Sequence, residues 1–276
     1  MNIQNLNLTI TELHHAAQLI SIAGNFLAKD KKGTHIAMEY SHSRRMLVGS
    51  VLKADKDLRV ALDISKLDLH ILSSRLDSLS KFDLKGRTKK EGFDYLKQEL
   101  RSFGSDTTIM VMETSYDIPD HPAGRGEPFQ TPDKNLLEQH IKLRSLAKDI
   151  LQSMARVFGN FSEILIWPNK FNTQMQIYFD PDKEGKMRST LDIGLGVKDE
   201  ISDQPYFFVN PHSEREINYP EPMPDLSLGK WHKDSTHFAY LQLVDLDPDK
   251  DLEHQEDRIA GFFSEAIERN LGIVAG

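Results

Sequence analysis

Residues 171–179 read Phe-Asn-Thr-Gln-Met-Gln-Ile-Tyr-Phe, and residues 189–197 read Ser-Thr-Leu-Asp-Ile-Gly-Leu-Gly-Val. In both stretches apolar side chains take every second position apart from Thr173 and Ser189, which is typical of a β-strand with one buried face. The same alternation recurs at 35–40, 59–64 and 66–71. Strands of this kind are typical of antiparallel sheets, so the sequence predicts an α+β fold, mostly antiparallel sheet with helices packed on it.

Apolar residues at helical spacing predict helices in both halves of the chain. Thr9 with Glu12, and Thr88 with Glu91, have the spacing of capping boxes at helix starts. The other expected elements are helices from Thr131-Pro132 to Gly159 and from Asp247-Pro248 to near Gly272, and strands at 108–112, 163–167, 205–210 and 236–244. Each half therefore reads helix, strands, helix, which leaves open a fold of two similar halves.

One segment interrupts these patterns. Residues 116–132 contain four prolines and two glycines, a composition that indicates either a linker or a long loop over one domain. The predicted organisation is an N-terminal α+β half at 1–115, this segment, and a C-terminal α+β half at 133–276 that carries the candidate site.

Composition excludes several classes of protein. The chain has 276 residues, a net charge of −8 and no cysteine. The acidic balance disfavours nucleic acid and anionic membranes as partners, and the lack of cysteine excludes disulfides and thiolate chemistry. There is no signal-peptide pattern, no apolar run of roughly 18 residues and no nucleotide-binding glycine motif. We expect a cytoplasmic protein with no cofactor.

A row of uncharged polar residues is the strongest candidate for a binding site. Asn172, Gln174, Gln176 and Tyr178 alternate with the apolar residues of one expected strand, and amides can donate and accept hydrogen bonds to a polar ligand. A hydrated sheet face explains the same row. If the 189–197 strand pairs with this one, Asp192 joins the row. The residues predicted to bind a small polar molecule are Asn172, Gln174, Asp192, Tyr206 and Trp231.

Two alternatives remain open. His232, Asp234 and His237, with Asp199 or Glu200, could serve a hydrolase-type enzyme if their side chains converge. A structural or interaction protein, for example a homodimer that buries a sheet edge, is the other reading.

Histidines elsewhere give weaker signals. His35, Glu39 and His42 could offer a metal site, but a solvated strand explains them as well and we predict no metal. His14 and His15 are expected on a helix surface.

The C-terminal half resembles a family of uncharacterised bacterial proteins. The shared features are Trp167-Pro-Asn-Lys-Phe-Asn172, Ile193-Gly-Leu-Gly196, Asp199-Glu200, Pro205-Tyr-Phe-Phe-Val209 and Gly229-Lys-Trp-His232. The family has no established activity, so the resemblance implies no particular reaction. Lys170 and Asn172 stand where the family has His and Asp, and neither is suited to acid–base or metal chemistry at an ordinary pKa. Either the motif is structural or this chain has lost the chemistry.

Overall fold

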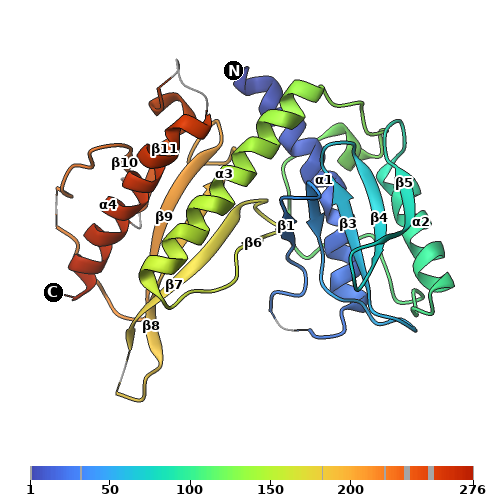
Figure 1. The fold of residues 1–276 in the computed structure, drawn as a ribbon, viewed down its shortest axis with the longest axis horizontal. Helices are drawn as coiled ribbons and strands as arrows, with labels where there is room; N and C mark the ends of the chain where they lie inside the picture. Colours follow the sequence, from blue (N-terminus) through green and yellow to red (C-terminus); the bar gives the residue numbers. More distant parts are fainter. Residues whose placement is uncertain are drawn as a thin grey trace. The chain divides into compact units, whose positions relative to one another are not determined.

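The computed structural model describes residues 2–31, 33–181, 183–220, 222–232, 237–247 and 252–275. It divides into two compact units, which are described separately. The first unit consists of residues 1–141 and 165–171, and the second of residues 142–164 and 172–276. Within the described residues each unit contains an antiparallel sheet with α-helices (Figure 1), so the predicted α+β fold with antiparallel sheet is confirmed.

The sheet of the first unit is a meander, in which neighbours in sequence are neighbours in space. Its strands are β1 (Glu39–Ser41), β2 (Met46–Val48), β3 (Leu58–Asp63), β4 (Asp68–Ser73) and β5 (Ser78–Asp83), in that order. Helices α1 (Ile3–Leu27) and α2 (Lys89–Ser102) pack on it, and β6 (Leu165–Ile166) bridges to Met38. Short connections favour this antiparallel order.

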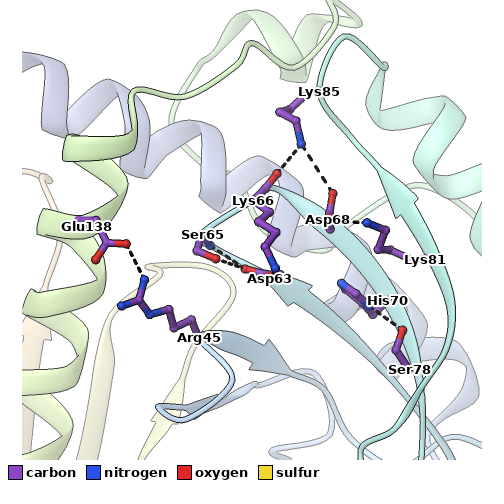
Figure 2. A network of polar contacts seen from close by, with 10 residues as sticks. All are labelled: Arg45, Asp63, Ser65, Lys66, Asp68, His70, Ser78, Lys81, Lys85 and Glu138. Atoms are coloured by element: carbon purple, nitrogen blue, oxygen red, sulfur yellow. Dashed lines mark hydrogen bonds and ion pairs between the residues drawn. The ribbon is translucent and has the colours of Figure 1, made fainter.

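The face of this sheet that carries polar residues is buried rather than solvated. Figure 2 shows Asp63, Asp68 and His70 on it, and all three side chains are buried. Asp68 pairs with Lys81 at 3.1 Å, and the hydroxyl and amide of Ser65 both donate to Asp63. The expectation of a single buried face is therefore wrong for β3 and β4, because these carboxylates are compensated by nearby donors.

Helix α1 begins earlier than the sequence pattern indicates. Asn2 is its N-cap, accepting from the amide of Asn5 at 3.1 Å. Thr9 lies inside the helix and donates to the Asn5 carbonyl, so the predicted capping box of Thr9 and Glu12 is wrong. The predicted box of Thr88 and Glu91 at the start of α2 is confirmed, with both reciprocal hydrogen bonds present.

The strand expected at 108–112 does not form. Asp106 accepts hydrogen bonds from the amide and the hydroxyl of Thr108, which holds the chain in a turn. Such a local turn competes with strand pairing. Ile109 and Val111 are consequently exposed.

Part of the Pro/Gly-rich segment packs on the first unit. We call residues 119–130 the strap; it contains the short 3₁₀ helix η1 (Pro122–Arg125). Helix α1 holds both ends of the strap. His15 Nε2 donates to the Pro119 carbonyl at 2.8 Å, and the backbone amide of Gln130 donates to the Glu12 carboxylate at 2.6 Å. This segment belongs to the first unit.

The second unit is a sheet with helices on one face. Its strands run in the order β10 (Lys230–Trp231), β11 (Ala239–Gln242), β9 (Tyr206–Ser213), β8 (Met187–Gly196) and β7 (Thr173–Pro181). Its helices are the C-terminal part of α3 (Lys134–Phe158), α4 (Glu256–Ala275) and the 3₁₀ turns η2 (Leu243–Asp245) and η3 (Leu252–Gln255).

Strand register shows which face the helices cover. Thr173, Leu195 and Phe207 are consecutive partners across β7, β8 and β9, so their side chains share a face. The buried Arg144 of α3 donates to the Thr173 hydroxyl at 2.7 Å, and the Phe263 ring of α4 meets that of Phe207 at 6.0 Å. Both helices therefore cover this face, and the alternate residues of each strand lie on the other.

Two predicted helix starts are wrong. Helix α3 begins at Lys134, because Asp133 rather than Thr131 accepts the hydrogen bonds of the first-turn amides of Asn135 and Leu136. Helix α4 begins at Glu256, after η3, rather than at Asp247.

Candidate functional site

The face of the second sheet opposite its helices gathers polar residues from three strands. Gln176 is the direct partner of Asp192, which is in turn the partner of Asn210; Tyr178, Thr190 and His212 form the next row. We call this surface the polar face. It comprises Asn172, Gln174, Gln176, Tyr178, Asp192, Asn210 and His212.

Asp192 is the centre of the hydrogen bonding. The Gln176 amide donates to one carboxylate oxygen at 2.9 Å, and His212 Nε2 lies 3.2 Å from the other. Tyr178 donates its hydroxyl to the Gln176 carbonyl at 3.1 Å. Both carboxylate oxygens therefore have a partner, and a chain of polar groups runs across three strands.

The ion pair with Asp192 raises the pKa of His212 above its ordinary value, while partial burial opposes the shift. The imidazole is half exposed and the carboxylate largely enclosed. A histidine in this state can exchange a proton with a bound molecule near neutral pH.

Asp192→Asn is expected to lower the pKa of His212 towards that of an exposed histidine, because the amide carries no charge. Since the folded-state pKa is the higher one, the pair stabilises fully below about pH 6.5 and is lost as pH rises through the folded-state value. A nuclear magnetic resonance titration of the His212 ring measures the midpoint. Gln176→Leu, which keeps the carboxylate, should move it less; an unchanged midpoint in Asp192→Asn would contradict the pairing.

Two buried amide oxygens on the polar face have no partner. Asn172 donates its amide to Gln174, but Oδ1 of Asn172 and Oδ1 of Asn210 have no hydrogen-bond partner within the described residues. Unsatisfied buried acceptors cost free energy and call for a partner such as a ligand or ordered water.

The predicted residue Tyr206 occupies the same face but is already engaged. Its hydroxyl donates to Asp199 at 2.7 Å, and burial followed by the Asp199 charge raises its pKa well above the ordinary value. It packs with Phe208 and Phe238 in an aromatic cluster. A Cβ at Gly196 would lie 2.6 Å from the Tyr206 ring, so this strand glycine makes room for the tyrosine rather than for a ligand.

The structure does not bring Trp231 to the other predicted residues. Trp231 pairs with Ala239, which pairs with Val209, and Val209 lies on the helix-covered face. Its indole N–H donates to the Pro224 carbonyl at 2.8 Å. Asn172, Gln174 and Asp192 share the polar face, whereas Trp231 is on the opposite one.

The histidines near Trp231 have separate neighbours. The His232 amide donates to the Phe238 carbonyl and its ring lies 6.2 Å from Tyr240, whereas the His237 ring stacks on Tyr219 at 3.8 Å. Asp234 lies outside the described residues. Within those residues no group of three or more His, Asp or Glu is placed to hold a metal ion, and this includes His35, Glu39 and His42.

Sequence reasoning did not choose four members of the polar face: Gln176, Tyr178, Asn210 and His212. Gln176 and Tyr178 belonged to the predicted row, and Asn210 ended the expected strand at 205–210. His212 was missed because β9 continues to Ser213. The alternation Tyr-Phe-Phe-Val-Asn-Pro-His over 206–212 could have extended that strand.

Comparisons with known proteins add no assignment. No family model, no curated protein and no solved structure matches the chain. None of the helices in the described ranges combines the length and apolar character needed to cross a membrane.

Proposed function

We propose that the second unit binds a small polar molecule rich in hydrogen-bond donors on the polar face. The observation that carries this proposal is the presence of two unsatisfied buried oxygens on the polar face, Asn172 Oδ1 and Asn210 Oδ1. Asn210 lies opposite Asp192 and beside His212, whereas Asn172 lies further along the same face, next to Gln174. Acceptor oxygens of this kind suit hydroxyl or amine groups. Polyols, sugars and amino acids are the classes of ligand that fit.

The neighbouring groups support this class. Gln174 and Gln176 add amides that both donate and accept, and the exposed ring edge of His212 adds a further donor. The three strands that carry them are held in register by the core on their other face, so the groups are preorganised.

The test is a titration of the whole chain with glucose, glycerol, amino acids and nucleosides. Nuclear magnetic resonance spectra monitor the side-chain amide and imidazole signals during the titration. Binding should shift the side-chain signals of Gln176 and His212. Each hydrogen bond contributes about 0.5–1.5 kcal/mol, so Asn172→Ala and Gln176→Ala should each weaken binding about 3- to 10-fold.

Gln152→Ala is the matched control, since Gln152 is an exposed amide on α3. Signals that stay unchanged with every compound, or shifts that survive the double variant Asn172→Ala/Gln176→Ala, would argue against binding at this face. The hydrolase alternative gains no support from His232 and His237. The homodimer and the cytoplasmic location stay predictions.

A further inference from the structure

Three segments of the first unit converge at the start of α2. The strap is held to the residues before α2 by two backbone hydrogen bonds, from Gly86 to Phe129 and from Phe129 to Arg87, each of 2.8 Å. It is also held to α1 through His15 and Glu12. Lys89, the first residue of α2, therefore lies where α1, α2 and the strap meet.

Lys89 differs from the lysine beside it. Lys90 is exposed and pairs with Asp94 at 2.5 Å, as expected one turn apart on a helix. Lys89 is partly buried, and within the described residues it has neither a hydrogen bond nor an ion pair. Burial without a compensating charge lowers the pKa of Lys89 to about 8.

The neighbouring ionisable groups are also buried. His15 is 4% exposed, and because Nε2–H donates to Pro119, Nδ1 carries the lone pair; Nδ1 is buried and has no partner among the described residues. Burial, then the charges of Lys89 and His121, lower the pKa of His15, although the Pro119 hydrogen bond opposes this.

Two further groups complete the surroundings. The ring of His121 lies 5.5 Å from that of His15, and burial lowers its pKa. Glu12, one turn before His15, is 5% exposed, and burial raises its pKa. For Lys89 itself, burial is the one cause of the lowered pKa, so no nearby charge offsets the cost of holding a proton on its amine. Asp120 is the acid of the strap whose charge acts on His15, and it opposes the lowering of the His15 pKa.

We infer that Lys89 is a nucleophilic amine that condenses with a small aldehyde or 2-oxo acid where α1, α2 and the strap meet. The neutral Nζ attacks the carbonyl carbon to form a C–N bond, giving a carbinolamine. The carbonyl oxygen then leaves as water, taking the two amine protons, and an imine remains. Buried lysines with depressed pKa are the ones suited to this chemistry.

The size of the effect follows from the neutral fraction of the amine. At pH 7 a lysine with a pKa of about 8 is roughly 10% neutral, whereas one with the ordinary value of 10.5 is roughly 300-fold less so. Nucleophilicity falls somewhat as pKa falls, so we expect Lys89 to react at least about 10-fold faster than Lys90 at that pH.

The experiment uses the whole chain with glyoxylate or propanal, and cyanoborohydride as the hydride donor that reduces the imine to a stable secondary amine. Peptide mass spectrometry then reports the rate of labelling at each lysine between pH 6 and 10. Labelling should occur first at Lys89, with a rate midpoint near pH 8, and Lys90 is the internal control in the same peptide region.

Two variants separate reactivity from folding. Lys89→Arg should abolish the fast label, and Lys90→Arg should leave it unchanged. Labelling of Lys89 that is no faster than that of Lys90, or that lacks a midpoint below pH 9, overturns the inference. Because the polar face belongs to the other unit, either result leaves the proposed ligand site independently testable.

Discussion

Gly24→Ala is expected to destabilise the first unit by about 3 kcal/mol or more. Gly24 lies in α1, and a Cβ there would stand 2.3 Å from the backbone carbonyl oxygen of His35. A backbone atom cannot rotate away as a side chain can, so either α1 or the chain at His35 must move. The gain in helix propensity from alanine, about 1 kcal/mol, is too small to offset this clash.

The same substitution in α4 should have the opposite sign. Gly261 is an exposed helical glycine with nothing within 4 Å of the added Cβ, so Gly261→Ala should stabilise the second unit by about 1 kcal/mol. Each unit contains one tryptophan, Trp167 in the first and Trp231 in the second. Urea unfolding can therefore be followed for each unit separately by tryptophan fluorescence. The Trp231→Phe background reports the first unit, and the Trp167→Phe background reports the second. A Gly24→Ala protein as stable as its parent would show that the close approach to His35 is not tight.

Phe171→Ala is expected to cost the first unit about 3–5 kcal/mol, the usual range for a fully buried phenylalanine. Phe171 is 0% exposed, and its ring stacks on His14 at 4.8 Å and on His140 at 6.1 Å. Removal of the ring leaves a cavity between two histidines, and neither can fill it without losing its place on its helix.

The control is Leu79→Ala in the same unit, because Leu79 is about half exposed on β5 and its loss should cost under about 1 kcal/mol. The stability of both variants is measured by urea unfolding in the Trp231→Phe background, where the fluorescence of Trp167 reports the first unit. A loss of less than about 1 kcal/mol for Phe171→Ala would mean that residues 165–171 are not an integral part of the first unit.

The sequence allowed most strands to be predicted, because alternation is a local property. It placed Asn172 and Gln174 on one face of a strand for the same reason, and Asp192 joined them only on the condition that the 189–197 strand pairs with theirs. It could not reveal that Asp192 pairs with Gln176, since register depends on the turn that joins β7 and β8 and on the packing of both strands.

Long-range contacts explain the remaining errors. His14 and His15 were expected on a helix surface, yet both are buried, and their hydrogen-bond acceptors are Pro168 and Pro119, 154 and 104 residues away. Helical spacing indicates which residues share a face but not what covers it. Lys89 gave no signal for a similar reason: its burial where α1 and the strap meet α2 depends on contacts between segments far apart in sequence.

The first unit is not continuous in sequence, and this affects the order in which the protein can mature during synthesis. Its last piece, residues 165–171, follows residue 141 only after part of the second unit has been made. That piece supplies the Pro168 carbonyl, which accepts from both His14 and Gln18. At translation rates of roughly 5–20 residues per second, synthesis of the stretch between the two pieces takes roughly a few seconds, and during that time the His14 ring lacks this acceptor. A ribosome-bound chain stopped before Trp167 should therefore be a target for chaperones, whatever the activity of the finished protein.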